Sequence, residues 1–265
     1  MVQKETQFSH LTLIGIEAAL LAGEILKQGY GTHFQISSKE GRHNLVTEYD
    51  HKSEKAIIEF LGKEVPGSYF LAEESGETGT AKEGIRWIID PLDGTVNFAH
   101  QIPFFSVSIA AEENGRVVSG VVYQPLTHEL FVGERGRGAF LNGQRLKVSP
   151  VKTIEESILS TGFPYNLADN PLHCIEHFTD ILRLGIPVRR MGVASLDLSY
   201  VAAGRFEGFF EARLAHWDYA AAALFVEEAG GRFTDWTGKP VRPNGSILAT
   251  NGHIHESLVA RLKSS

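Results

Sequence analysis

The stretch WIIDPLDGTVNFAH, residues 87–100, places two aspartates behind a run of apolar residues and follows them with glycine and threonine. The apolar run is typical of a buried strand, and Pro91 and Gly94 both interrupt regular structure. We expect Asp90 and Asp93 to flank a sharp turn at the carboxyl end of this strand, with their carboxylates close together. Such a pair is stable when it shares a proton or binds a divalent cation.

The residues after this pair indicate a phosphate site. Oxygen ligands favour Mg²⁺, Mn²⁺ or Ca²⁺ over zinc. Gly94 begins a segment that can start a short helix, so the N–H groups of Gly94 and Thr95 can hold phosphoryl oxygens. The Thr95 hydroxyl group can orient a water molecule or relay its proton. The alternative for these residues alone is an ordinary capped turn.

Two further segments place an acid at the edge of an element. YFLAEESG, residues 69–76, ends a predicted strand with Glu73, and HWDYAAAALFVEEAGG, residues 216–231, begins a predicted helix with Asp218 in its first turn. Alone, Asp218 is explained by the helix dipole and Glu73 by a solvated turn. Together with the aspartate pair they favour a shared metal site.

Composition limits the class of protein. The chain has 265 residues, 43% of them hydrophobic, which is enough for a large core. Its formal net charge of -7 argues against nucleic acid or an anionic membrane as the main partner. The single cysteine, Cys174, is interpreted as a helix or core residue, and we expect a cytoplasmic protein. We predict neither a signal peptide nor a membrane span.

The predicted elements indicate a layered α/β fold without repeats or separating linkers. An antiparallel, strand-rich N-terminal half, about 1–150, precedes a C-terminal half, about 151–265, in which strands and helices alternate. We expect both halves to form one domain, residues 1–265. Helices are predicted at 11–28, 50–65, 171–184, 194–203 and 216–229, with Asp50 as the N-cap of the second, and tight hairpins at Asn114-Gly115 and Asn142-Gly143.

Three other patterns are given structural interpretations. GERGRG, residues 133–138, resembles half of a dinucleotide fingerprint, but a strand follows it instead of a helix, so we predict turn or bulge glycines. His253 and His255 lack a third ligand nearby and are interpreted as a solvated helix cap. Asp235 lies among turn residues and is assigned to the turn.

The segments LAEES, WIIDPLDGTVNF and HWDYAAAALFVEEAGG resemble the three signature segments of the inositol monophosphatase family, the Mg²⁺-dependent, lithium-sensitive phosphatases. The resemblance covers nearly the whole chain, and it implies a five-layered αβαβα sandwich and a homodimer. It also implies a first Mg²⁺ held by Glu73, Asp90 and the carbonyl of Leu92. A second Mg²⁺ would be held by Asp90, Asp93 and Asp218, and a weaker third ion would also use Glu73.

The resemblance continues upstream in KEGRHNLVTEYD, residues 39–50. It implies that Lys39 lies on a mobile basic loop near the metals. It also implies that Asp50 accepts a hydrogen bond from the Thr95 hydroxyl, in addition to its predicted capping role. Thr95, Asp50 and Glu73 would then orient the attacking water.

Downstream, RRMGVASLDLSYVAAGRFEGFFEARLAHWD, residues 189–218, is similar to the substrate-facing half of the family. Gly192, Val193 and Ala194 would lie beside the polyol, and Glu211 would bind its hydroxyl groups. Val193 stands where animal inositol phosphatases carry threonine, and the loop TGFPYN is of a bacterial type.

These features together predict a phosphomonoesterase that hydrolyses myo-inositol 1-phosphate with water activated by Mg²⁺. The alternatives on the same fold are phosphatases for fructose 1,6-bisphosphate, 3′-phosphoadenosine 5′-phosphate or histidinol phosphate. For these, Arg189, Arg190 and Arg213 are candidate contacts to a second phosphate. An alternative of another class is a catalytically silent metal-binding protein or a regulatory partner.

Overall fold

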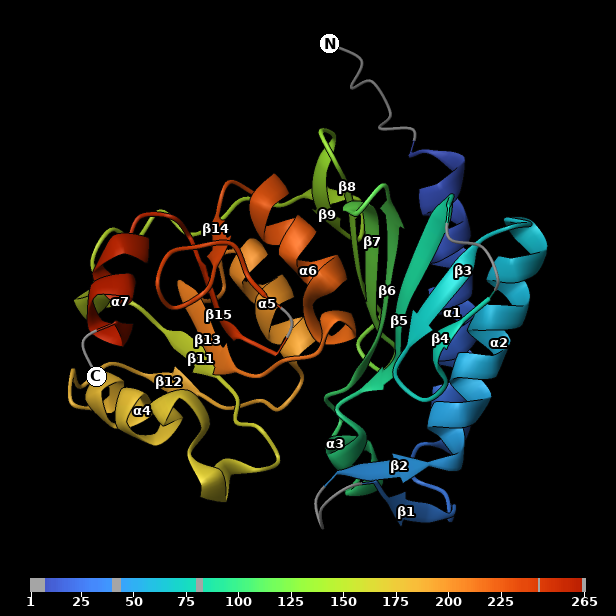
Figure 1. Ribbon diagram of the computed structural model, residues 1–265, viewed down its shortest axis with the longest axis horizontal. Coiled ribbons are helices and arrows are strands. Elements are labelled where there is room, and N and C mark those ends of the chain that lie inside the picture. The colour runs from blue at the N-terminus through green and yellow to red at the C-terminus, as the bar shows by residue number, and fades with distance from the viewer. Residues whose placement is uncertain (1–7, 40–43, 80–82, 243, 264–265) are drawn as a thin grey trace.

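The chain folds into five layers in which helices and β-sheets alternate (Figure 1). The structure is a computed structural model that describes residues 8–39, 44–79, 83–242 and 244–263. The outer helices are α1 (His10–Gly29) and α2 (Glu48–Glu64), the central ones α5 (Ala194–Ala202) and α6 (His216–Glu228), and those of the far layer α4 (Cys174–Leu182) and α7 (His255–Leu262). The predicted αβαβα sandwich is confirmed.

The first sheet has eight strands. Their order is β10 (Gln144–Arg145), β9 (Gly138–Leu141), β8 (Glu129–Glu134), β7 (Arg116–Gln124), β6 (Ser106–Glu113), β5 (Ile85–Asp93), β3 (Tyr69–Ala72) and β4 (Gly76–Thr78). Only β3 and β5 pair in parallel. The two predicted hairpins are confirmed, because φ is positive at both residues of Asn114-Gly115 and Asn142-Gly143, as tight two-residue turns require.

The second sheet has five strands and mixed directions. Their order is β12 (Val188–Arg189), β11 (Leu159–Thr161), β13 (Gly208–Ala212), β15 (Ser246–Thr250) and β14 (Arg232–Thr234). A separate antiparallel pair, β1 (Ile36–Ser38) and β2 (Leu45–Thr47), lies beyond the end of the first sheet (Figure 1). The short helices are α3 (Thr95–Ala99), η1 (Ile154–Glu156), η2 (Leu167–Asp169) and η3 (Pro171–His173). The division into two halves near residue 150 stays a prediction.

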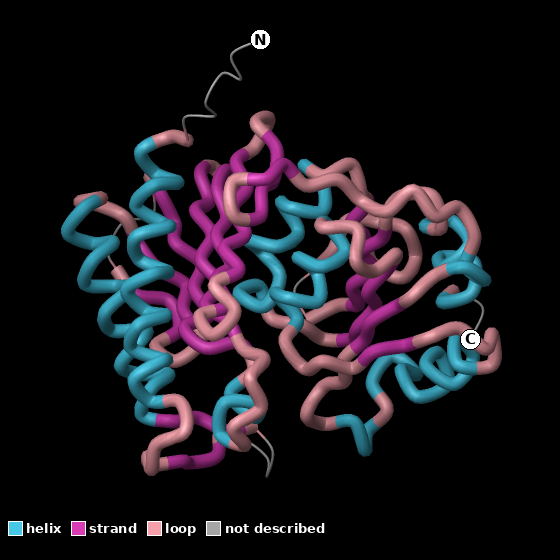
Figure 2. The backbone as a smooth tube through the Cα atoms, turned by 180° about the vertical axis from the view of Figure 1, so that it is seen from behind, coloured by secondary structure: helices cyan, strands magenta, loops and turns pink. Residues whose placement is uncertain are grey.

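Helix α6 is the element on which both sheets meet. Its alanine-rich sequence is buried on most of its surface, as expected for a helix that is apolar all round. The first sheet approaches it closely at Gly120, where an added methyl group would lie 2.9 Å from the carbonyl oxygen of Ala221. Figure 2 shows from behind that α1 and α2 cover the opposite face of that sheet. Side chains of α6 at the end near β5 can therefore reach a site built mainly by the first sheet.

Three helix predictions need correction. Helix α2 begins with Thr47 as its N-cap, and Asp50 occupies the third helical position of a capping box. The helix predicted from 171 begins at Cys174, because Leu172 and His173 have positive φ angles and break the helical path. His255 is fully buried, not solvated, and its ring nitrogens lie 3.0 and 2.9 Å from the hydroxyl groups of Thr234 and Thr250.

Other structural interpretations are confirmed. The segment 133–138 forms the end of β8 and the turn into β9. Asp235 accepts hydrogen bonds within its own turn, and Cys174 is buried.

Within the described residues, no helix is long and apolar enough to cross a membrane.

Candidate active site

The aspartate pair lies on a β-bulge, not on the predicted sharp turn. Strand β5 continues through Pro91 to Asp93, and its pairing with β6 shifts between Asp90 and Asp93, where β5 has one more residue than β6. Proline is tolerated at a bulge because it has no N–H group to contribute to the ladder. A bulge also changes the direction in which the next side chains point.

Four carboxylates from three elements act on one another at this end of β5. Asp218 comes from the first turn of α6, and Glu73 directly follows β3. Burial raises the pKa of Asp90 well above its usual range, and the charges of the other three acids raise it further. Burial, with the charges of Asp93 and Glu73, does the same for Asp218. The structure thus brings together the four acids that the sequence singled out.

Protein donors hold one oxygen of each aspartate. The Leu92 N–H donates to Asp90 Oδ1 at 3.0 Å, and the Ala215 N–H donates to Asp218 Oδ2 at 2.7 Å. Asp93 Oδ2 accepts from the N–H of Ser195 at 2.8 Å and from its hydroxyl at 2.6 Å. These bonds leave the second oxygen of Asp90 and of Asp218 for another ligand, whereas the backbone of Ala194 also hydrogen-bonds to Asp93.

The donor set fits a hard divalent cation. Burial, with the charge of Glu73, raises the pKa of Asp93 to about 6, although hydrogen bonds from Ser195 oppose this shift. Oxygen donors with excess negative charge are those that Mg²⁺ prefers. Among the described residues no group of three or more His, Cys, Asp or Glu side chains stands in a ready metal-binding arrangement. The acids are instead turned toward the protein donors described above.

Glu73 is paired with the predicted basic residue Lys39. The Lys39 ammonium donates to Glu73 Oε1 at 2.9 Å and to Glu74 Oε1 at 2.6 Å. Burial lowers the pKa of Lys39, but the two carboxylates raise it above its usual range. Residues 40–43 of the predicted mobile loop lie outside the described residues.

Thr95 and Asp50 form a buried hydrogen-bonded pair. The Thr95 hydroxyl lies 2.9 Å from Asp50 Oδ1 and 3.0 Å from the Leu92 carbonyl oxygen. Asp50 Oδ2 accepts from both the N–H and the hydroxyl of Thr47, at 2.8 and 2.7 Å. One carboxylate therefore serves the start of α2 and the Thr95 hydroxyl. Burial outweighs these bonds and raises the pKa of Asp50 to about 6.

The predicted substrate-facing segment packs directly on the β5–α3 junction. Gly94 has a φ of 91°, and a methyl group there would lie 2.7 Å from Val193 Cγ2. Asn97 Nδ2 donates to the Met191 carbonyl at 3.0 Å, which fixes the chain just before Gly192 and α5. Glycine at 94 is thus required both by the left-handed backbone and by the close approach of Val193.

Glu211 lies on β13, is 8% exposed, and faces a second acid that the sequence analysis did not single out. Burial, followed by the charge of Asp197, raises its pKa to about 8, although the charge of Arg190 opposes this shift. Arg190 therefore lies near this side of the site. The sequence signal for Asp197 was its position as the one charged residue of the predicted helix 194–203.

Ser195 and Tyr165 were also missed. Ser195 supplies two donors to Asp93, and a serine carries no signal beyond its position at a helix start. Tyr165 is 61% exposed on the loop before α4. Partial desolvation, followed by the charges of Glu73 and Asp93, raises its pKa, so this side chain lies within the field of the acidic cluster. The loop TGFPYN thus reaches the site.

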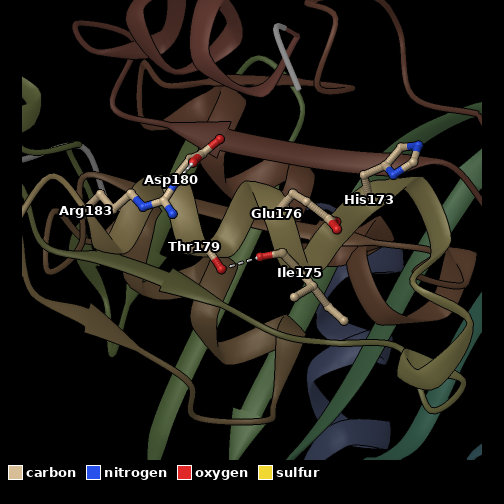
Figure 3. Close-up of a pocket in the computed structure, with 6 residues that line it drawn as sticks. All are labelled: His173, Ile175, Glu176, Thr179, Asp180 and Arg183. Carbon is tan, nitrogen blue, oxygen red and sulfur yellow. Dashed lines mark hydrogen bonds and ion pairs between the residues drawn. The ribbon is translucent and has the colours of Figure 1, made fainter.

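A separate pocket of about 510 Å³ lies on the outside of α4 (Figure 3). Its lining comes from η3, α4 and the residue after α4, and consists of His173, Ile175, Glu176, Thr179, Asp180 and Arg183. None of the predicted site residues lines it, so it is distinct from the acidic cluster.

Comparison with a solved structure supports the fold class. The crystal structure of extragenic suppressor protein suhB from Bartonella henselae matches with a TM-score of 0.91 at 42% identity, over 97% of this chain and 100% of that chain. The chain therefore belongs, by its fold, to the class of αβαβα sandwich proteins that this structure represents.

The particular family follows from the sequence comparisons. The model of the inositol monophosphatase family matches residues 7–265, and the chain belongs to that family. Inositol-1-monophosphatase of Rhizobium meliloti is 43% identical over 254 residues, covering 94% of this chain and 95% of that protein. Nus factor SuhB of Escherichia coli strain K12 is 40% identical over 252 residues, covering 94% of each.

Proposed function

We propose that this protein is a Mg²⁺-dependent phosphomonoesterase that hydrolyses myo-inositol 1-phosphate to inositol and phosphate. The observation that carries the proposal is the acidic cluster, Glu73, Asp90, Asp93 and Asp218, beside the hydrogen-bonded Thr95–Asp50 pair. The name of the Rhizobium meliloti relative supports inositol phosphate as the substrate.

The proposed metal ligands are the four acids and the carbonyl of Leu92. Glu73, Asp90 and Leu92 would hold one Mg²⁺. Asp90, Asp93 and Asp218 would hold a second, and Glu73 could share a third. The ions would supply a lowered pKa for the attacking water and compensation for the charge of the departing alkoxide.

The chain's own residues provide a path for the proton of the attacking water. Thr95 already donates its hydroxyl hydrogen to Asp50 Oδ1, so its oxygen lone pairs can accept a hydrogen bond from water. Proton transfer from water to Thr95 can therefore accompany transfer from Thr95 to Asp50. Because the pKa of Asp50 is raised to about 6, this carboxylate is a suitable base near neutral pH. Glu73 is the other acid proposed to orient the water.

The remaining site residues would bind the two ends of the substrate. The N–H groups of Gly94 and Thr95, at the start of α3, are proposed to hold phosphoryl oxygens, which stabilises charge without a covalent intermediate. Gly192, Val193 and Ala194 would line the polyol, and the Glu211 carboxylate would accept its hydroxyl hydrogens. The packing of Val193 on Gly94 supports a continuous surface from phosphate to alcohol.

Phosphate release from a panel of monoesters, with Mg²⁺ and with a chelator, tests this function. The panel should contain inositol 1-phosphate, fructose 1,6-bisphosphate, 3′-phosphoadenosine 5′-phosphate and histidinol phosphate. We expect the highest kcat/KM for inositol 1-phosphate and no release in chelator. Preference for a bisphosphate would assign Arg190 to a second phosphate and overturn the proposed substrate.

A second candidate is the regulatory role that the relatives named Nus factor SuhB favour. The chain and its Asp93→Asn variant would be expressed in Escherichia coli lacking that relative. If both proteins restore the property that the cells lose without that relative, the result would support a role independent of hydrolysis. If neither protein restores it, this candidate is removed. The charge argument against a nucleic-acid partner stays a prediction, as do the homodimer and the cytoplasmic location.

A further inference from the structure

Asp197 is a buried acid that the proposed mechanism does not use. It lies in the first turn of α5, is 1% exposed, and its Oδ1 has no hydrogen-bond partner among the described residues. Burial, followed by the charge of Asp93, raises the pKa of Asp197 well above its usual range, although the Ser160 side chain on β11 and the charge of Arg190 oppose this shift. An ionised carboxylate with so little hydrogen bonding is unfavourable in such a place, so we expect the acid to keep its proton.

The second sheet presents another acid toward Asp197. Strands β11 and β13 run parallel, with Ser160 opposite Phe209. Side chains alternate between the faces of a sheet, so Glu211 projects from the same face as Phe209. Phe209 packs in the apolar cluster formed with α5 and α6. Asp197 and Glu211 therefore face one another between α5 and the sheet, and Asp197 is the neighbouring charge that acts most strongly on Glu211.

The other charged groups around Asp197 and Glu211 do not neutralise both acids, so one of the two carboxyl groups still needs a proton. Arg190 lowers the pKa of both acids, whereas burial and Asp93 raise them. The pKa of Glu211 is still raised to about 8. The charge of Glu211 also acts on Asp218 and on the thiol of Cys174. One guanidinium thus faces several carboxyl groups, and a protonated member of the pair balances the charge.

We propose that Asp197 is a positioning residue for the alcohol side of the site: its protonated carboxyl group donates a hydrogen bond to the Glu211 carboxylate and orients it toward the substrate hydroxyl groups. This inference rests on the proposed function, in which Glu211 binds the polyol. A carboxyl–carboxylate bond keeps Glu211 ionised and leaves its second oxygen as an acceptor. Asp197 itself is too deeply buried to contact substrate.

The test compares Asp197→Leu with Asp197→Asn in the Mg²⁺-loaded enzyme. Leucine has a similar size without a donor, whereas asparagine keeps an N–H donor and serves as the matched control. The measured quantity is the ratio of kcat/KM for inositol 1-phosphate to that for p-nitrophenyl phosphate, which offers no hydroxyl groups. We expect the leucine variant to lower this ratio about tenfold and the asparagine variant to keep it within about twofold.

Two further readouts do not depend on turnover. The infrared difference spectrum of wild type minus Asp197→Asn should contain the C=O stretching band of a protonated carboxyl group at neutral pH, and this band should shift in D₂O. The melting temperature of Asp197→Leu should not fall, because leucine removes a buried acid from apolar surroundings. If the leucine variant does not fold, the spectrum still tests the proton on Asp197.

The outcomes separate this inference from the proposed substrate. Equal losses on both substrates in both variants, with lower melting temperatures, would make Asp197 a structural residue and overturn the inference. Absence of the carboxyl band would also overturn it. A wild-type enzyme that hydrolyses p-nitrophenyl phosphate but not inositol 1-phosphate would instead overturn the proposed substrate, and the infrared band would still decide whether Asp197 carries the proton.

Discussion

Thr95 is the residue at which the proposed proton path can be tested most directly. Its hydroxyl lies 2.9 Å from a carboxylate oxygen of Asp50, and both side chains are buried. We expect Thr95→Ala to lower kcat by about two to four decades, because a positioned proton relay is lost. Steady-state kinetics at saturating Mg²⁺ measures this effect.

The matched control for this change is Thr95→Ser, which keeps the hydroxyl group. We expect it to retain most of the turnover, and we expect Mg²⁺ affinity to be similar in both variants, because Thr95 contributes no carboxylate. A rise in KM alone in the alanine variant would mean that Thr95 only binds substrate.

Asp93 and Asp218 test the proposed metal sites. Replacing either acid by asparagine removes one charge from the cluster that is proposed to hold two ions, so turnover should fall by about a hundredfold or more. Phosphate release across a Mg²⁺ titration checks this. Full turnover in either variant at saturating Mg²⁺ would rule out the two-ion arrangement.

The substitution Asp93→Asn should also stabilise the metal-free protein. In the folded chain the pKa of Asp93 is raised to about 6, from about 4 in an unfolded chain. Between these values the folded state binds more protons, so the free energy of unfolding in chelator should fall as pH rises through this window. Above it, Asp93→Asn should melt at a higher temperature than wild type, and added Mg²⁺ should reverse that order. An unchanged melting temperature in chelator would contradict the proposed repulsion.

Glu211 tests what is recognised beyond phosphate. Loss of a charged hydrogen-bond acceptor should lower kcat/KM of Glu211→Ala for inositol 1-phosphate by roughly one to two decades. Hydrolysis of p-nitrophenyl phosphate should be affected far less, since it offers no hydroxyl groups. Parallel kinetics on both substrates decides the matter, and equal losses would assign Glu211 to the metal site or the fold.

At the scale of elements, Lys39, the residue that follows β1, places its ammonium group where a metal is proposed to bind. Lys39 donates to both Glu73 and Glu74. We expect Lys39→Met to bind Mg²⁺ a few-fold more tightly, because no ammonium competes for Glu73, and the modest size reflects a partly exposed ion pair. Calorimetric titration measures the affinity. Lys27→Met, which removes an ion pair within α1, is the control and should leave it unchanged.

At the scale of the whole molecule, the close packing of α6 on the first sheet can be tested at Gly120. A methyl group there would lie 2.9 Å from the Ala221 carbonyl oxygen and 3.0 Å from the Ala221 Cα. Backbone atoms cannot yield as a flexible side chain can, so Gly120→Ala should lower the free energy of unfolding by about 1–3 kcal/mol. Urea denaturation measures this loss.

Gly62 supplies the control for that change. It lies within α2, and its added methyl group would be 3.6 Å from Phe70, an ordinary contact. Alanine favours a helix over glycine, so Gly62→Ala should leave stability unchanged or raise it by up to about 1 kcal/mol. A loss in both variants would mean that glycine is needed for reasons other than the approach of α6.

The sequence predicted most elements and the identity of the clustered acids. Helix periodicity, hairpin dipeptides and the acids at the ends of elements are features of short windows, so they can be recognised without knowing the partners. The errors occurred where a local pattern had two solutions. Pro91 could end the strand or occupy a bulge, and Asp50 could be an N-cap or the third residue of a capping box.

Only the tertiary structure decided which side chains complete the site. Ser195 donates to Asp93 across 102 residues of sequence, and Thr95 to Asp50 across 45. Asp197 acts electrostatically on Glu211 because α5 packs on the second sheet, and no local pattern contains that proximity. The sequence by itself determined the elements and the residues that carry charge, since these depend on neighbours in the chain. The raised pKa values and the hydrogen bonds depend on burial and on distant partners, which exist only once the layers have packed.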